Sequence, residues 1–335
     1  MKNIKFHIAV FFGWLSLFAQ AQDPHFTQFY SAPMAVNPAY TGVFRGQLRF
    51  MSNFRQQWNG LGTPFTTAYA SLDGKIGSGR SEGVGQNPFN MGVQFMNDRS
   101  MKGAFKSNYI NTSASYHVVL DYDGFKSLGA GLSFSYADRR IDFTSISFDE
   151  QFMSGGFNLT MPNGEAALQN MKPFASVGAG LLYRYDNTYT GEFFDIGVSG
   201  YHFNRPSQTV LNDPTQFLPF RLSAQVSWQK YLDDNTILNL KGLYQSQASI
   251  NYFLGGFSLA KLVGDPKNMI GAGCWYRSAE AVSPYVFLEY NHLLIGFTYD
   301  MVMGSLNKGP KPARASEISL QWRLGQGREN QVGLY

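Results

Sequence analysis

Cysteine, charge and long apolar runs are all scarce in this chain of 335 residues. A single cysteine, Cys274, excludes an internal disulfide and any metal site built on several thiolates. Charged residues make up 15% of the chain, well below the roughly 25% of an average soluble domain. The net charge of only +4 argues against a nucleic-acid partner. Beyond the N-terminal leader, no stretch approaches the ~20 consecutive apolar residues of a transmembrane helix.

Aromatic residues and glycine are plentiful instead, at 16% of the chain and 35 residues respectively. The hydrophobic residues, 44% of the total, are diluted by polar neighbours and not gathered in runs. Cys274 itself lies in an alternating apolar stretch, which predicts a buried or lipid-facing small side chain.

Residues 1–21 have the three parts of a signal peptide. Lys2 and Lys5 form a basic start, residues 6–18 an apolar core, and Ala19-Gln20-Ala21 a small-x-small cleavage site. The residue directly after the cleavage point is Gln22 and not a cysteine, so a lipid anchor is not expected. We expect the mature chain to begin at Gln22 after export from the cytoplasm.

From about residue 47 onward the apolar residues recur with a period of two, which is typical of β-strands. In residues 110–120 one face carries Ile110, Thr112, Ala114, Tyr116, Val118 and Leu120, and the other carries Asn111, Ser113, Ser115 and His117. Residues 127–137, 220–229 and 317–324 repeat the pattern. About fourteen such segments begin near residues 47, 64, 89, 108, 127, 173, 193, 220, 236, 249, 269, 284, 293 and 316. Each is near the ~10 residues that a tilted membrane-spanning strand needs.

The lengths of the connections predict which end of the barrel faces the periplasm and which end faces outside. With a periplasmic N-terminus, the connections after odd-numbered strands face outside and are expected to be longer. The long connections 138–172, 203–219 and 304–315 fall in that set, and the tight turns 121–124, 232–235, 264–268 and 291–292 fall in the other. The Gly/Ser-rich connection 74–88 is long yet periplasmic, so it is either a contact loop or a sign that the count is wrong there.

The polar faces distinguish a membrane barrel from a soluble sheet protein. They carry mostly Ser, Gly, Asn, Gln and Thr, which suit a narrow or filled lumen, whereas a soluble sandwich usually shows Lys and Glu to water. Aromatic residues near strand ends predict an interfacial girdle: Tyr183, Tyr185, Tyr285, Phe287 and Tyr290. We therefore expect an all-β fold, an antiparallel transmembrane β-barrel of about 14 strands with an irregular N-terminal segment.

No motif predicts a catalytic, cofactor or metal site. Gly129-Ala130-Gly131 and its two counterparts lie within strands and lack the dinucleotide fingerprint. The five histidines have no metal-ligand spacing, and Gly197-Val198-Ser199-Gly200 is not a nucleophile elbow. We expect no enzyme activity and no cofactor, although scattered residues of a barrel can still meet in space. Inward-predicted charges suggest ion pairing inside the lumen or, less favoured, ion selectivity: Arg221, Lys241, Asp300, Glu317 and Arg323.

The proline-broken block 22–42, QDPHFTQFYSAPMAVNPAYTG, closely resembles the opening of the PorP/SprF family. Shorter pieces agree, namely residues 55–58 (RQQW), 194–199 (FDIGVS), 271–277 (GAGCWYR), 296–300 (GFTYD) and 316–318 (SEI). The resemblance covers essentially the whole mature chain. It implies an outer-membrane protein of the type IX secretion and gliding-motility machinery in a Gram-negative cell.

By this resemblance, the chain would help to secrete or anchor one adhesin-like substrate with a C-terminal sorting domain. The expected partners are outer-membrane lipid, that substrate and periplasmic components of the machinery. The family motif suggests partner-binding residues Phe26, Gln28, Tyr30, Asn37, Pro38, Tyr40 and Gly42. The alternative is an outer-membrane channel for small solutes. The expected division is a signal peptide (1–21), an irregular segment at the periplasmic mouth or plugging the lumen (22–46), the barrel (47–325) and a tail (326–335).

Overall fold

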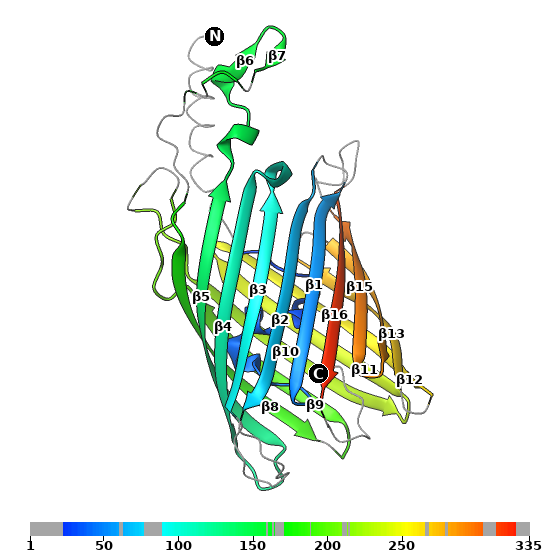
Figure 1. The fold of residues 1–335 in the computed structure, drawn as a ribbon. Coiled ribbons are helices and arrows are strands. Elements are labelled where there is room, and N and C mark those ends of the chain that lie inside the picture. Colours follow the sequence, from blue (N-terminus) through cyan, green and yellow to red (C-terminus); the bar gives the residue numbers. More distant parts are fainter. Residues whose placement is uncertain are drawn as a thin grey trace, which may run out of the picture.

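A computed structural model shows a closed antiparallel β-barrel (Figure 1). The structure describes residues 23–59, 63–76, 89–158, 160–162, 164, 171–187, 189–209, 213, 215–264, 268–278, 281–303 and 313–325. The predicted signal peptide and C-terminal tail lie outside these residues. Among the described residues, no helix is long and apolar enough to cross a membrane.

Fourteen strands form the barrel, in agreement with the predicted count. They are β1 (Leu48–Asn59), β2 (Phe65–Ile76), β3 (Phe89–Ser100), β4 (Phe105–Val119), β5 (Lys126–Ile141), β8 (Phe174–Asn187), β9 (Glu192–Tyr201), β10 (Arg221–Asp233), β11 (Thr236–Gln247), β12 (Ile250–Val263), β13 (Asn268–Arg277), β14 (Ala281–Tyr290), β15 (Leu293–Val302) and β16 (Arg314–Leu324). Two short strands, β6 (Phe152–Met153) and β7 (Gly156–Phe157), pair outside the barrel. Short helical turns are η1 (Phe29–Ser31), α2 (Pro33–Val36), η2 (Pro38–Tyr40), η3 (Met101–Gly103), η4 (Phe143–Ser145) and η5 (Asp149–Gln151).

The first and last strands close the barrel. β1 pairs with β16 from Leu48 opposite Leu324 to Asn59 opposite Arg314, and every other barrel strand pairs with its neighbours in chain order. Closure matters because an open strand edge in lipid would leave backbone N–H and C=O groups without partners.

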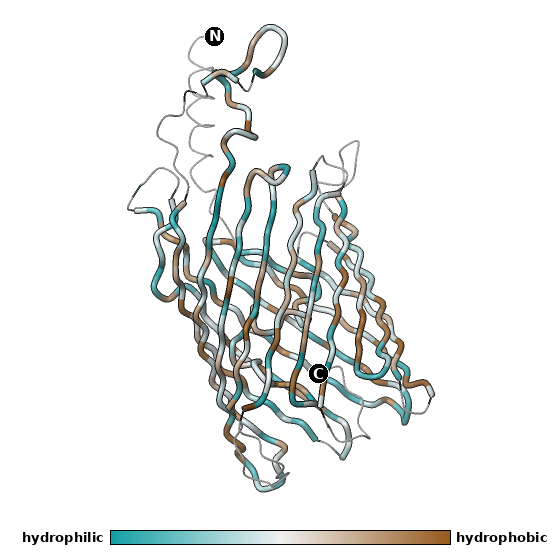
Figure 2. The backbone as a smooth tube through the Cα atoms, viewed as in Figure 1, coloured by the Kyte–Doolittle hydropathy of each residue, from teal (hydrophilic) through white to brown (hydrophobic). Residues whose placement is uncertain are grey.

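The predicted alternation sets the two faces of the wall. In β4, Ile110 and Tyr116 are 52% and 46% exposed, whereas Ser115 is 2% exposed. Large apolar side chains therefore point outward to lipid, and small polar ones point into the lumen. Figure 2 shows the same alternation of brown and teal along the strands. Cys274 is free and lies on the outward face, between the exposed neighbours Ala272 and Tyr276.

Strand starts agree with the sequence to within three residues. The largest differences are β4, which starts at Phe105, and β14, which starts at Ala281 although the sequence suggested 284. Pro284 explains the second difference, because a proline lacks the N–H of the ladder and looks like a boundary. In the structure Pro284 lies inside β14 opposite Cys274, and the pairing with β15 skips that position.

The two rims differ as the loop lengths predict. The connections 142–173 and 202–220 lie at one rim, with β6 and β7 projecting beyond it (Figure 1). The opposite rim carries the tight turns and the start of β1 and end of β16. Outer-membrane barrels keep short turns in the periplasm, so the first is called the outer rim and the second the periplasmic rim. β2 ends and β3 begins at the periplasmic rim, and the connection between them, 77–88, lies outside the described residues.

The prediction of an aromatic girdle was correct only for some of its residues. Tyr290 is 65% exposed on the outward face, and Tyr183 and Tyr185 share the outward face of β8. Tyr285 and Phe287, in contrast, are each 3% exposed and point into the lumen. Two-residue periodicity does not say which face of a strand points into the lumen, and the inward face of β14 carries both of these rings.

Candidate functional site: the filled lumen

Residues 23–46, called the plug below, lie inside the barrel (Figure 1). Proline breaks this segment into short turns, since Pro33 starts α2 and Pro38 starts η2. The side chain of Asn37 caps η2 by accepting the backbone N–H of Ala39 at 2.9 Å. Its three helical turns pair part of the plug backbone internally, and the barrel wall supplies hydrogen-bond partners for further backbone groups.

The N-terminal end of the plug is held at the outer rim by charge. The carboxylate of Asp23 lies 2.7 Å from His202, 3.1 Å from Arg221 and 3.5 Å from Arg139. Its backbone N–H donates to the side chain of Gln247 at 3.0 Å. Burial alone raises the pKa of Asp23, but the neighbouring His202 and Arg221 outweigh it and hold this pKa well below the ordinary value. Asp23 is therefore a buried anion beside two guanidinium groups and the imidazole of His202.

A second anchor is the carboxylate of Glu317 on β16. It accepts the backbone N–H of Thr27 at 2.8 Å and that of Gln28 at 2.9 Å. Asn53 on β1 donates to the same carboxylate at 2.7 Å. Hydrogen bonds to a charged acceptor contribute about 1.5–3 kcal/mol each, so this group fixes the start of η1 firmly.

Asp300 on β15 forms a third anchor. Its carboxylate accepts from Arg277 at 2.7 Å and from Arg55 at 3.0 Å. Ser283 donates to it at 2.7 Å and Thr27 at 3.1 Å. The two guanidinium groups share this carboxylate, and Arg55 also donates to the carbonyl of His25 at 2.7 Å.

In the middle of the plug, the wall satisfies carbonyl groups. Tyr201 donates to the carbonyl of Met34 at 2.8 Å, and Arg221 donates to that of Ala35 at 2.9 Å. Ser199 donates to the carbonyl of Val36 at 2.6 Å. These bonds satisfy buried carbonyl oxygens, which would cost about 1–3 kcal/mol each if left bare.

The C-terminal end of the plug is held near the periplasmic rim. The Tyr40 hydroxyl donates to Asp195 at 2.6 Å. The backbone N–H of Gly42 donates to Asp73 at 2.7 Å, and Arg49 binds the same carboxylate through two nitrogens at 3.0 and 2.8 Å. The plug thus runs from the outer rim to the periplasmic rim and there enters β1.

Glycine in the wall lets the plug approach closely. A Cβ added at Gly131 would lie 2.3 Å from the backbone nitrogen of Ala39, and one at Gly180 would lie 2.0 Å from the side-chain oxygen of Asn37. Any side chain at these positions would displace η2. Gly131 of β5 and Gly180 of β8 therefore let η2 and its cap lie directly against the wall.

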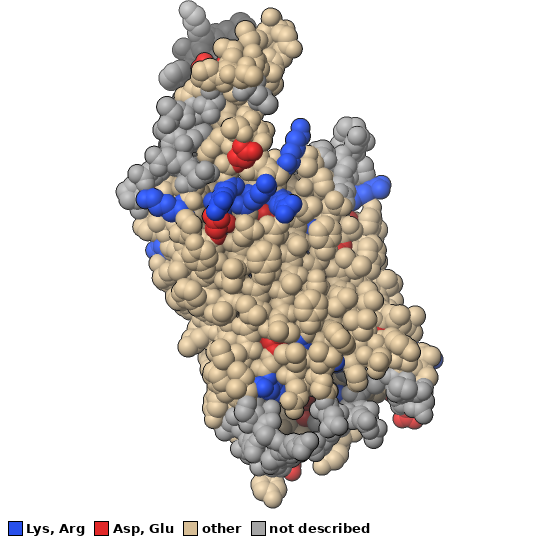
Figure 3. Space-filling view, viewed as in Figure 1, with Lys and Arg blue, Asp and Glu red and all other residues tan. Residues whose placement is uncertain are grey.

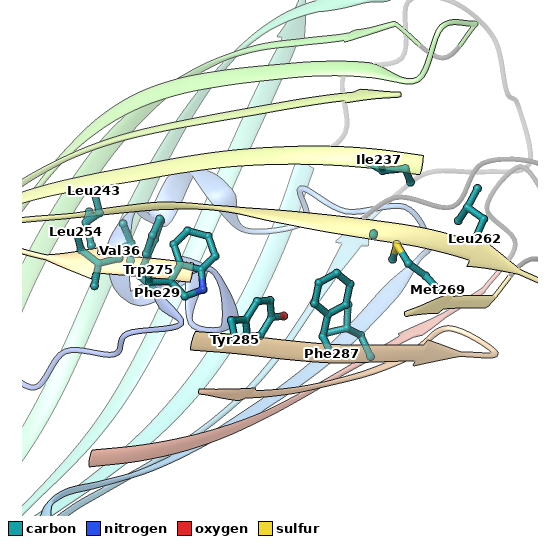
Figure 4. Close-up of a cluster of buried hydrophobic side chains, with 12 residues drawn as sticks. Phe29, Val36, Ile237, Leu243, Leu254, Leu262, Met269, Trp275, Tyr285 and Phe287 are labelled. Carbon is teal, nitrogen blue, oxygen red and sulfur yellow. The ribbon is translucent and has the colours of Figure 1, made fainter. Parts of the chain in front are cut away.

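Apolar contacts fill the lumen on the other side. Phe29 and Tyr30 of the plug pack on Trp275 of β13, with ring centroids 6.2 and 5.1 Å apart. Tyr285 lies 5.8 Å from Tyr30. Figure 4 shows Phe29, Val36, Trp275, Tyr285 and Phe287 gathered among the strands, in a cluster that continues along β11 to β14. The ammonium group of Lys241 lies 4.3 Å from the Tyr30 ring centre.

All seven residues suggested by the family motif belong to the plug. Six of them are buried and Tyr30 is partly buried, against the wall of their own barrel: Phe26, Gln28, Tyr30, Asn37, Pro38, Tyr40 and Gly42. Of the five charges suggested for lumen pairing, Lys241 lies over the Tyr30 ring, and the other four also point inward and meet other residues. Arg221 meets Asp23, Asp300 meets Arg55 and Arg277, and Arg323 meets Glu289. Glu317 binds plug N–H groups.

The sequence reasoning missed Asp23, Arg55, Asp73 and Arg277 as members of this network. Asp23, Arg55 and Arg277 had been quoted only as parts of family motifs. Strand parity gives a signal for Asp73 and Arg277, because both fall on the inward face of their strands. Within the described residues, no group of His, Cys, Asp and Glu is arranged to hold a metal ion.

Comparisons with known proteins agree with this architecture. The family model described as "Type IX secretion system membrane protein PorP/SprF" matches residues 18–322. No curated protein matches the sequence.

Among solved structures, a FadL homologue from Pseudomonas aeruginosa is 11% identical, with 85% of this chain and 91% of that chain covered and a TM-score of 0.50. The toluene transporter TodX from Pseudomonas putida is 8% identical, with 87% and 92% covered and a TM-score of 0.47. The likeness to the FadL homologue supports the fold alone, an outer-membrane β-barrel. The family model covers most of the sequence, and the chain therefore belongs to the PorP/SprF family of type IX secretion system membrane proteins.

Proposed function

We propose that this barrel helps the type IX secretion and gliding machinery to export or anchor one adhesin-like surface substrate with a C-terminal sorting domain. The observation that carries the proposal is the plug, which fills the lumen from Asp23 to Arg45 and is hydrogen-bonded to the wall at both rims. A lumen occupied in this way suits a protein that positions partners better than one that conducts small solutes.

In this proposal, partners bind the plug at either of its two ends. Its N-terminal end meets His202 at the start of an outer loop and Arg139 at the outer end of β5, and its C-terminal end lies near the periplasmic rim. We propose that periplasmic components of the machinery contact the latter and that the family-motif residues bind partners when the plug shifts. Export by a cleaved signal peptide belongs to the same proposal.

The outer loops are proposed to meet the substrate. The hairpin β6–β7 carries Phe152 and Phe157, which are 62% and 55% exposed and whose ring centres lie 5.0 Å apart. Exposed apolar side chains beyond the membrane often mark protein-binding sites. F152S/F157S should lower surface display of the substrate without affecting barrel insertion. Y122S/Y189S, at the periplasmic rim and 89% and 86% exposed, is the matched control.

Deletion of residues 22–45 tests the function directly. The truncated barrel, inserted in the outer membrane at normal abundance, should lose surface display of the substrate. Unchanged display would refute the proposal, and a gain of solute conductance in planar bilayers with display intact would favour the channel alternative. A pull-down of the full chain from solubilised outer membrane should recover machinery components.

A disulfide lock tests whether the plug must move. Thr41 of the plug and Ser113 of β4 have hydroxyl oxygens 2.8 Å apart, so T41C/S113C should form a disulfide under oxidation. Display should stop when the disulfide forms and recover on reduction. The single variants T41C and S113C are controls, because neither can bridge plug and wall.

A further inference from the structure

Three cations form a row across neighbouring strands at the outer rim. Arg99 on β3 lies directly opposite Lys106 on β4, and Lys106 lies directly opposite Arg140 on β5. All three side chains are exposed on the outward face of the wall, and Lys102 in the turn between β3 and β4 adds a fourth exposed cation. In Figure 3, blue side chains gather along the rim of this face, above a broad band with few charges.

The rows below this cationic row place it at the boundary between lipid and water. The next outward positions on the same strands are polar: Asn97, Asn108 and Asp138. The row below those is apolar, with 46%, 52% and 48% of the side chains exposed, and consists of Phe95, Ile110 and Tyr136. An outward apolar belt that gives way to polar residues is the pattern of a strand leaving the bilayer.

The chain itself does not neutralise this row. Like charges directly opposite each other on paired strands have Cβ atoms about 5 Å apart and are destabilising. Arg140 pairs with Asp138 at 2.8 Å. Among the described residues, neither Arg99 nor Lys106 has a carboxylate partner. The nearby carboxylate of Asp142 accepts bonds from Thr144 and Ser145. Arg99 and Lys106 therefore face outward at the rim, and the described residues supply no counterion for them.

We propose that this row binds the phosphate groups of an anionic outer-leaflet lipid of the lipid A class. Arginine binds phosphate through paired N–H groups, and lysine adds a mobile point charge. A lipid standing against the wall would place its phosphates beside Arg99, Lys106 and Arg140 and its acyl chains along the apolar row. A soluble acidic protein would have no use for the apolar row, which lies within the membrane. This inference is independent of the substrate role proposed above.

The test compares two triple variants of the full-length barrel in neutral detergent. R99Q/K106Q/R140Q removes the row. K126Q/K230Q/K261Q removes the same charge from exposed, outward lysines at the periplasmic end of β5, β10 and β12. Diphosphoryl lipid A is titrated in, and its bound fraction is read by native mass spectrometry. A change in gel mobility on heating verifies that each variant is folded.

The outer-rim triple should bind lipid A on the order of 100-fold more weakly than the unmodified protein, since each basic residue near an anionic lipid surface contributes about fivefold. The periplasmic-rim triple should bind nearly as well as the unmodified protein. Equal loss in the two triples would overturn the proposal, because it would indicate general charge attraction. Equal binding of dephosphorylated lipid A, or full competition by inorganic phosphate, would also overturn it.

K106Q gives a second readout that does not depend on binding measurements. In neutral detergent it should unfold at the same or a higher temperature than the unmodified protein, because it removes the central of three facing cations. In vesicles of phosphatidylcholine with diphosphoryl lipid A it should unfold at a lower temperature. The same sign of change in both media would contradict the proposal.

Discussion

Glu317 on the last strand accepts the backbone N–H of Gln28 in the plug at 2.9 Å. This bond joins two residues that are 289 positions apart in sequence. β16, the strand that closes the barrel by pairing with β1, thereby also holds the plug in place. Barrel closure and plug placement are coupled through one carboxylate, and the first prediction concerns it.

We expect Glu317→Gln to loosen the N-terminal half of the plug while the barrel stays closed. The amide nitrogen of glutamine cannot accept the second N–H, so one buried donor is left bare at a cost of about 1–3 kcal/mol. Hydrogen exchange at Thr27 and Gln28, read by mass spectrometry, should become faster. Glu150→Gln, in an exposed outer loop, is the control, and unchanged exchange in E317Q would refute the coupling.

Asp300→Asn should destabilise the whole barrel. It leaves the guanidinium groups of Arg55 and Arg277 buried without their carboxylate, and breaking a buried pair typically costs about 3–5 kcal/mol. Urea-induced unfolding in detergent measures the loss. Replacing Asp300 and both arginines together by apolar residues should recover part of it. A change below about 1 kcal/mol in D300N would show that water already screens this group.

Gly180→Ala should displace the plug without breaking the strand. Its Cβ would fall 2.0 Å from the side-chain oxygen of Asn37, so the cap of η2 must move. Faster proteolysis within residues 23–46 of the folded barrel is the expected result. The control is Gly242→Ala, where the added Cβ meets its nearest atom, on Val226, at 3.3 Å. Equal proteolysis of the two variants would mean that the close contact is not limiting.

The outer end of the plug should remain anchored under mild acid. Because the pKa of Asp23 in the folded protein lies below its ordinary value of 3.8, its contribution to stability is fully present above that value. The contribution is lost only as the pH falls below 3.8 and through the lowered value. The protection factors against hydrogen exchange at residues 25–28, which correct for the pH dependence of intrinsic amide exchange, should change little between about pH 7 and about pH 5. Asp23→Asn should release this end already at neutral pH, and equal protection in D23N would contradict the role of the charge.

Strand parity predicted the wall well because it depends on local geometry. Alternation in β4 placed Ile110 and Ser113 on opposite faces of the strand, and the turn at residues 121–124 fell at the predicted rim. Alternation alone failed for Tyr285 and Phe287, which look like girdle residues by type and position near a strand end. Their inward direction follows from the aromatic cluster with Tyr30, a contact across more than 250 residues of chain.

The sequence by itself determined the closed barrel, its strand count and its two rims, because period-two alternation and loop lengths are local properties. It also marked the N-terminal block as distinct, since its prolines forbid a strand. Only the tertiary structure decided where that block lies and which charges meet. Asp23 reaches Arg139, His202 and Arg221 because barrel closure brings β5, β9 and β10 around one lumen. Such pairings between distant segments depend on curvature and register, which no local pattern encodes.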